Sequence, residues 1–283
     1  HVKDLFRDEY QIRGLKLERP DGSSETVGCE ALILACNGYG GNPEMVLRYI
    51  PEMADAMYFG HPGNQGDAVN WGIELGAGTR DLGSFQGHGS VAHPHGILIT
   101  WVLLTEGGIL VNANGRRFTN EHEGYSEQAK RVLAQVDGLA WDIYDHRLHL
   151  LGLGFEEYRE ANKLGAVKSA STIEGLADIL GLPANELTAT VNECAELSKG
   201  KMADPFKRNF TTKPNLTPPY YGIQVTGSLF HTQGGLMVNE QAYVLEKDGA
   251  PFPNLFASGG AAAGISGPAD WGYLSGNGLL SAI

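Results

Sequence analysis

Three observations predict an α/β fold in which one divided domain is interrupted by a second, inserted domain. Residues 31–36 read Ala-Leu-Ile-Leu-Ala-Cys, a continuous apolar run typical of a strand buried on both faces. Residues 253–257 form a second short apolar strand that runs into glycine. Between these segments, residues 80–225 change in character and include several stretches of helical pattern. Because the pattern of strands and glycines occurs at both ends of the chain, we expect the two ends to form one domain.

The predicted domain boundaries follow these changes in pattern. We expect residues 1–78 to form the first segment of the divided domain, 79–228 the insert, and 229–283 the closing segment. Within the insert, helices are predicted at about residues 126–136, 173–180 and 184–198. Thr172 is a suitable cap for the second of these helices, and Gly181 separates it from the third.

Net charge, apolar runs and cysteine spacing limit which binding partners and which cellular compartment are expected for this protein. A chain of 283 residues with a net charge of −12 is a poor match for nucleic acid or anionic membranes, which favour clustered Lys and Arg. No apolar run reaches the roughly 18 residues of a transmembrane helix, so none is expected. Three cysteines without paired or metal-ligand spacing fit a reducing compartment. We therefore expect a cytoplasmic protein with no bound metal.

Glycine is used about twice as often as is usual, with 39 residues gathered in separate short motifs. One motif, Asn37 to Gly41, follows the first apolar strand, and another, Ser258 to Gly260, follows the second. A third, Gly276 to Gly278, opens an apolar helix. Glycine permits close backbone approach or positive φ, and a helix start offers unpaired N–H groups. These motifs predict a seat for an electron-rich group that accepts hydrogen bonds.

Three blocks in the right order resemble one flavoprotein superfamily. They are Gly108-Ile-Leu-Val-Asn with Arg117-Phe-x-Asn-Glu121, then His231-Thr-Gln-Gly-Gly235, and finally the carboxyl-terminal glycine motifs. Together they resemble the fumarate reductase / succinate dehydrogenase flavoproteins and the 3-ketosteroid dehydrogenases over residues 25–283. The resemblance implies a partial Rossmann-like FAD-binding domain interrupted by an α+β capping domain, with FAD as cofactor. Because the amino-terminal GxGxxG is absent, we expect a fragment that lacks that part.

The same resemblance implies which residues contact FAD. They belong to the glycine-rich turns and the start of the last helix: Ala35, Asn37, Gly38, Gly40, Gly234, Gly235, Gly259, Gly260, Gly276, Asn277, Gly278 and Leu279. At Gly260 many relatives carry Glu, which contacts the FAD ribose, so this chain departs from the family there.

The site also departs from the fumarate reductases at their arginines. The position of the catalytic arginine is Tyr125, and residues 266–272 contain no arginine to clamp a carboxylate. This pattern is similar to that of the 3-ketosteroid dehydrogenases, which implies that Tyr125 moves a proton and that Tyr273 and Ser275 hold the ketone oxygen. Two hydroxyl donors there would stabilise the enolate charge that builds on this oxygen.

Two histidines match residues that contact substrate in fumarate reductases. His231 precedes the Gly-Gly pair, and His88 matches the other histidine, although His93 and His95 lie nearby and leave the register open. A histidine that is merely hydrogen-bonded at a domain crossing is the alternative for His231, and a solvated side chain is the alternative for His88.

The predicted function is therefore an FAD-dependent oxidoreductase that adds or removes hydrogen across a C–C bond beside a carbonyl. Its small-molecule substrate is expected to be bulky and mostly apolar, with a carbonyl, and its electron donor or acceptor is unidentified. A reductase of an unsaturated acid that uses His88 and His231 is one alternative. A binding or assembly module with a flavoprotein fold and no activity is the alternative from another class.

Overall fold

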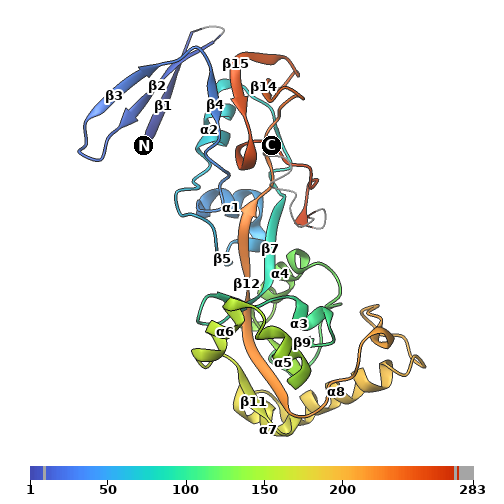
Figure 1. Cartoon of the computed structure of the whole chain (residues 1–283). Helices are drawn as coiled ribbons and strands as arrows, with labels where there is room; N and C mark the ends of the chain where they lie inside the picture. The colour runs from blue at the N-terminus through green and yellow to red at the C-terminus, as the bar shows by residue number, and fades with distance from the viewer. Residues whose placement is uncertain (9–10, 271–272, 274–283) are drawn as a thin grey trace. The chain divides into compact units, whose positions relative to one another are not determined.

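A computed structural model describes residues 1–8, 11–270 and 273, and divides the chain into two compact units. The first unit consists of residues 1–54, 58–86 and 229–283, and the second of residues 55–57 and 87–228. Figure 1 shows their helices and strands, and each unit is described by itself below. None of the helices within the described ranges is long and apolar enough to cross a membrane.

The first unit contains small sheets and two short helices. Its described elements are β1 (Val2–Arg7), β2 (Ile12–Glu18), β3 (Ser24–Gly28), β4 (Leu32–Leu34), α1 (Pro43–Tyr49), η1 (Pro51–Met53), α2 (Asp67–Leu75), β6 (Thr79–Arg80), β13 (Gly235–Leu236), β14 (Tyr243–Leu245), β15 (Pro251–Ala257) and η4 (Gly259–Ala261). The η elements are single 3-10 turns. Strands β1, β2 and β3 form an antiparallel sheet, drawn in blue in Figure 1, and β14, β15 and β4 form another.

Parallel pairing of β4 with β15 brings the two ends of the chain together in the first unit. Leu34 lies opposite Ala257 in this ladder, so the glycine turns after both strands begin at the same edge. The Asn254 side chain also bonds the backbone N–H and C=O of Ile12, at 2.9 and 2.8 Å. This strand pairing therefore fixes where the predicted cofactor turns meet.

Strand β4 is less buried than its sequence predicts. Leu34 packs in the core of the unit with Leu255 and Ala257, but the Ile33 side chain is 66% exposed. The prediction of a strand buried on both faces is wrong here, because β4 is an edge strand with one face turned away from this core.

Helices of the first unit begin and end where their sequence signals lie. Asn42 caps α1 by accepting hydrogen bonds from the backbone N–H groups of Glu44 and Met45. Helix α2 starts after Gly66 and stops at Gly76, and both glycines have left-handed backbone that a side chain would disfavour. Helix α2 also packs near the β13 strand, which begins at Gly235.

The second unit is built around a larger sheet with helices. Its described elements are β8 (Ile97–Leu98), α3 (Val102–Thr105), β9 (Ile109–Val111), α4 (Tyr125–Leu133), η2 (Val136–Gly138), β10 (Leu139–Asp145), α5 (His146–Gly152), α6 (Glu156–Lys163), β11 (Lys168–Ala170), α7 (Ile173–Leu180), α8 (Ala184–Leu197) and η3 (Phe210–Thr212). Strands β5 (Met57–Tyr58), β7 (Phe85–Ala92) and β12 (Tyr220–Thr232) have residues in both units. The sheet order is β8-β7-β12-β10-β9, with β11 and β5 also paired to β12.

The predicted helices of this unit are confirmed within a residue or a few. Helix α7 spans the predicted residues, and Thr172 caps it by accepting a hydrogen bond from the Gly175 N–H. Gly181 ends it with left-handed backbone, and α8 follows over Ala184–Leu197. These boundaries were readable from sequence because caps and glycine stops act locally.

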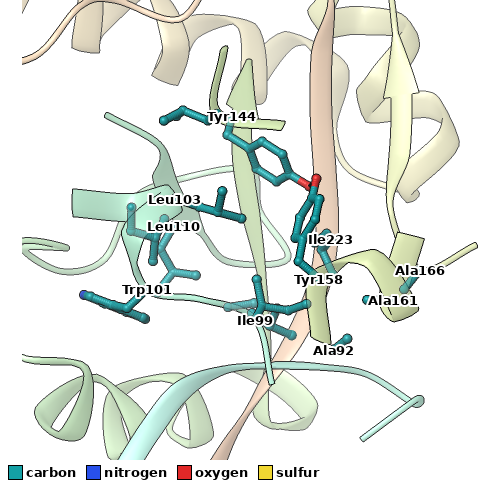
Figure 2. Packing of buried hydrophobic residues seen from close by; sticks show 14 of the residues in the cluster. Ala92, Ile99, Trp101, Leu103, Leu110, Tyr144, Tyr158, Ala161, Ala166 and Ile223 are labelled. Carbon is teal, nitrogen blue, oxygen red and sulfur yellow. The ribbon is translucent and has the colours of Figure 1, made fainter. Parts of the chain in front are cut away.

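A hydrophobic core of the second unit packs against the central strands of the sheet. Figure 2 shows Ile99, Trp101, Leu103 and Ile223 converging there, together with two buried tyrosines from β10 and α6. The hydroxyls of these tyrosines, Tyr144 and Tyr158, lie 2.8 Å apart, so both are satisfied inside an apolar environment.

Candidate active site

The ends of β4 and β15 place two predicted cofactor segments in contact within the first unit. Asn37 has left-handed backbone with φ of 66°, and its side-chain oxygen accepts a hydrogen bond from the Gly38 N–H at 2.9 Å. A Cβ on Gly260 would lie 2.1 Å from this oxygen, and one on Gly38 would lie 2.0 Å from the Thr232 hydroxyl. Segments 37–38, 232 and 260 therefore pack too tightly for any side chain at these glycines.

Gly234 and Gly235 also lie where neighbouring backbone leaves no room for a side chain. A Cβ on Gly234 would lie 2.0 Å from the backbone oxygen of Asp81, and one on Gly235 would lie 2.6 Å from that of Ala261. Similarly, a Cβ on Gly40 would lie 2.4 Å from the ring of Tyr58. These contacts are to protein atoms, so the glycines are needed for segment packing, whereas sequence reasoning attributed them to close approach of a cofactor.

A cavity of about 500 Å³ opens where these segments meet. Phe230 adds an aromatic face, and the polar lining comes from Asn37, His61, Asn64, His231, Thr232, Gln233 and Tyr273. Among the described residues, no Lys, Arg, Asp or Glu lines it. The volume lies in the range of cofactor and substrate sites, and the lining offers neutral hydrogen-bonding groups.

His231 and Tyr273, two of the predicted catalytic residues, are brought together at this cavity. Their rings meet edge to face, with centroids 6.1 Å apart and planes at 78°. Partial burial lowers the pKa of His231 below its ordinary value, so its imidazole is neutral at pH 7. The pair can therefore present neutral N–H and O–H donors to an acceptor atom.

Sequence reasoning missed other residues of the same cavity. Asn64 donates to the Tyr58 hydroxyl at 2.8 Å, and Phe230 stacks on Phe59 with centroids 5.2 Å apart. Gln233 belongs to the predicted motif 231–235 but was not expected to be a site residue. Its side chain is almost completely buried and lines the cavity. The signal that could have found it was its position directly between His231 and the glycine pair.

Other predicted residues lie elsewhere or outside the described part of the chain. Ala35 is exposed just after β4 and does not line the cavity. Gly259 and Gly260 do line it. Ser275, Gly276, Asn277, Gly278 and Leu279 fall outside the described residues.

His88 and Tyr125 form a second histidine–tyrosine pair, inside the second unit. Tyr125 is the first residue of α4, and its ring stacks on His88 with centroids 5.0 Å apart. Trp101 meets the same imidazole edge to face at 5.6 Å. Burial lowers the pKa of His88 to about 3, and the Ser90 N–H donates to its Nδ1 at 3.1 Å. His88 is therefore a neutral, enclosed side chain, while His93 and His95 are exposed.

The motif that carried the strongest resemblance forms a buried ion network in the second unit. Arg117 donates to both carboxylate oxygens of Glu121 at 2.7 Å and to Asp204 at 2.7 Å. Arg208 lies 3.1 Å from the same Glu121 carboxylate. Burial alone would raise the pKa of Glu121, but its hydrogen bonds from Arg117 and the two guanidinium charges lower it. Both arginines are thus committed to neighbouring carboxylates.

One more buried carboxyl lies close to the His88 segment. Asp142 on β10 accepts a hydrogen bond from the Ser90 hydroxyl, and its Oδ1 has no partner among the described residues. Burial raises the pKa of Asp142 to about 7, against the opposing effect of the Ser90 hydrogen bond. The surroundings of Asp142 therefore favour the protonated form of its carboxyl.

A match to a family model identifies the class of protein. The model described as FAD binding domain matches residues 1–279, so the chain belongs to this family of FAD-binding proteins. The predicted superfamily, the α/β fold class and FAD as its cofactor are confirmed.

Individual relatives come from both branches of the predicted superfamily. The chain is 28% identical over 282 residues to a probable fumarate reductase, Ifc3, of Shewanella frigidimarina, covering 100% of this chain and 47% of the relative. It is 28% identical over 272 residues to a 3-oxosteroid 1-dehydrogenase of Mycobacterium tuberculosis, covering 83% and 48%. The chain therefore spans about half the length of these curated relatives.

A solved structure supports the same fold. The open conformation of a flavocytochrome c3 fumarate reductase matches with a TM-score of 0.78 and 27% identity, over 99% of this chain and 49% of that one.

The lining of the first-unit cavity fits an FAD ring. An isoalloxazine combines a flat apolar surface with carbonyl and nitrogen acceptors. Phe230 offers an aromatic face to the first, and the Asn37 amide and Thr232 hydroxyl offer hydrogen-bonding groups to the second. Asn37 and Gly260, from the paired turns, would border the group.

Proposed function

We propose that this chain is part of an FAD-dependent oxidoreductase that adds or removes hydrogen across a C–C bond adjacent to a carbonyl. The absence of Lys, Arg, Asp and Glu from the described lining of the first-unit cavity carries the proposal. A dicarboxylate would need a cationic partner, but no described Lys or Arg lines this cavity. Arg80, whose guanidinium reaches the Gly264 carbonyl at 3.5 Å, is paired with Asp81. A neutral ketone is therefore the better match.

The cavity residues have distinct tasks in this scheme. The Tyr273 hydroxyl and the neutral His231 imidazole donate hydrogen bonds to the ketone oxygen, where negative charge builds as the neighbouring C–H proton leaves. Ser275 is the predicted second hydroxyl donor. The neutrality of His231 matters, because an imidazolium would favour a carboxylate over a ketone. When bound, FAD supplies the two-electron exchange with the substrate.

Proton transfer is assigned to Tyr125, in keeping with the resemblance. Its position at the first residue of α4, stacked on His88, holds the ring in one orientation by aromatic contact. The proposed substrate is a bulky, mostly apolar ketone. An unidentified electron donor or acceptor exchanges the electrons, and the cytoplasm is the proposed location.

Anaerobic flavin reduction tests the proposal. A saturated 3-ketosteroid mixed with the FAD-loaded protein should bleach the flavin absorption band. Tyr273→Phe should slow this bleaching by about 10²-fold, because one donor to the developing oxyanion is lost. Tyr125→Phe should slow it by about 10²-fold through loss of proton transfer. Unchanged bleaching in Tyr273→Phe would contradict the assignment of this cavity to the ketone.

A reductase of an unsaturated acid is the second candidate, and its support is the similarity to the probable fumarate reductase of Shewanella frigidimarina. Oxidation of a reduced viologen dye by fumarate, with no response to the ketosteroid, would favour it. A protein that binds no flavin and remains colourless would instead indicate a binding or assembly module.

A further inference from the structure

The segment that carries Tyr273 is attached to the cavity wall through one glutamine. Gln233 is hydrogen-bonded through its backbone on both sides: its N–H donates to the Ser84 carbonyl at 2.8 Å, and its carbonyl accepts from the Gly264 N–H at 2.8 Å. All of these residues belong to the first unit. The backbone at position 233 is therefore fixed relative to the start of the segment.

The side chain of Gln233 makes the next attachment. The Ser266 hydroxyl donates to Gln233 Oε1 at 3.0 Å, and the two residues are only 4% and 5% exposed. Ser84 contributes a further bond, from its hydroxyl to the Ala269 carbonyl at 3.1 Å. Residues 264–269 are thus hydrogen-bonded at their beginning, middle and end to the pair Gln233 and Ser84.

Tyr273 lies four positions after Ala269, the last residue of this anchored stretch. Its N–H lies 3.5 Å from the Asp270 carbonyl, and its ring meets His231 at the cavity. His231 is itself only two residues before Gln233. The same short segment therefore supplies one proposed ketone ligand and holds the loop that supplies the other.

The unused half of the Gln233 amide argues against a purely stabilising role. Its buried Nε2 has no hydrogen-bond partner among the described residues. A buried polar group without a partner lowers stability, and an apolar side chain of similar length, such as Met, would avoid that cost. Unlike Met, Gln233 has a side-chain oxygen that accepts the hydrogen bond from Ser266.

We propose that Gln233 is a positioning residue that acts through Ser266 to hold Tyr273 at the geometry needed for the ketone oxygen. This inference rests on the role of Tyr273 in the proposed function. Hydrogen-bond catalysis depends steeply on placement, so small movements of the Tyr273 hydroxyl lower turnover without removing the binding cavity.

Turnover and thermal unfolding of matched variants test the proposal in the FAD-loaded protein. Gln233→Met and Ser266→Ala should each lower kcat about 10-fold, the effect of one hydrogen bond. Ser266 does not line the cavity, so Ser266→Ala should keep KM and the Kd for FAD within about twofold. The double variant should be no slower than either single variant, because both remove the same bond. Gln233→Met should leave the thermal midpoint unchanged or raise it. Gln241→Met, at an exposed turn of the same unit, is the control and should match the wild type.

The Tyr273→Phe background separates positioning from a general structural effect. There, Gln233→Met should lower kcat by less than about twofold, since the group that it positions is gone. A Gln233→Met protein with a lower thermal midpoint and unchanged kcat overturns the inference, as does a full 10-fold loss in the Tyr273→Phe background. If Tyr273→Phe alone leaves turnover unchanged, that result contradicts both the proposed function and this inference. If Tyr273→Phe slows turnover and Gln233→Met does not, only the inference falls.

Discussion

His231 and Tyr273 in the first unit, and His88 and Tyr125 in the second, are two histidine–tyrosine pairs in different surroundings. The first pair meets edge to face and lines a cavity, whereas the second is stacked, with a histidine that is only 5% exposed. In the first unit, polar side chains border a space that a ligand can occupy. In the second, Arg117 and its neighbours satisfy one another.

The comparison shows that a recognisable motif and a reactive site need not coincide. The Arg117 to Glu121 block carried the strongest resemblance, but its charged groups are joined in a closed network. The cavity is bordered by no Lys, Arg, Asp or Glu among the described residues. A sequence motif shared by a family can therefore consist of residues that stabilise a domain as well as residues that take part in the reaction.

The largest expected effect concerns the network of the second unit. Glu121→Gln leaves Arg117 and Arg208 without their shared carboxylate in a buried place, so the free energy of unfolding should fall by about 3–5 kcal/mol. Denaturant unfolding followed by circular dichroism measures this fall.

A matched control exists on the surface of the same unit. Glu186 pairs with Arg116, and both side chains are largely exposed, so Glu186→Gln should cost about 0–1 kcal/mol. Equal losses in the two variants would contradict the distinction between a buried network and a solvated pair.

A smaller effect is expected at Asp142. Its pKa is raised from 3.8 to about 7 in the folded protein, so the folded state binds more protons than the unfolded state between these values. The free energy of unfolding should therefore fall as the pH rises from about 4 to 7. Asp142→Asn keeps an oxygen for Ser90 and should remove this fall, which gives a gain of about 2–4 kcal/mol at pH 8.

Unfolding curves at pH 4.5 and 8 measure the change. The two proteins should be similar at the lower pH and differ most at the higher pH. If the two proteins differ by the same amount at both pH values, the pKa of Asp142 is the same in the folded and unfolded states, in contradiction to the raised pKa.

Local signals predicted much of the fold. Thr172 and Gly181 placed the ends of α7, and the apolar runs at residues 31–36 and 253–257 located β4 and β15. Caps, stops and apolar runs can be read from a few adjacent residues, because the interactions that they report lie within one turn or one strand.

Long-range pairings could not be predicted in the same way. The exposure of Ile33 depends on where β4 lies in its sheet, and the Ser266–Gln233 bond joins residues 33 positions apart. The ion pair of Arg117 with Asp204 spans 87 positions. Such contacts depend on tertiary packing, which no local pattern specifies.

Only part of the candidate site could be predicted, because its remaining contacts also depend on tertiary packing. His231, Gly260 and Tyr273 were expected from motif order, and the structure places them at one cavity. The glycine pair was expected to face a ligand, but its missing side chains are required by Asp81 and Ala261 backbone. A glycine in the sequence indicates that a side chain would not fit at that position. It does not indicate whether protein backbone or a ligand occupies the space.

Hydrogen–deuterium exchange of the purified protein with and without FAD tests the central claim most directly. Added FAD should slow exchange in segments 37–40, 231–235 and 259–264, because these border the first-unit cavity. Segments 117–121 and 204–208, which hold the buried network, should exchange at the same rate in both states. FAD-dependent protection of the network segments, with no change at the three cavity segments, would contradict the account.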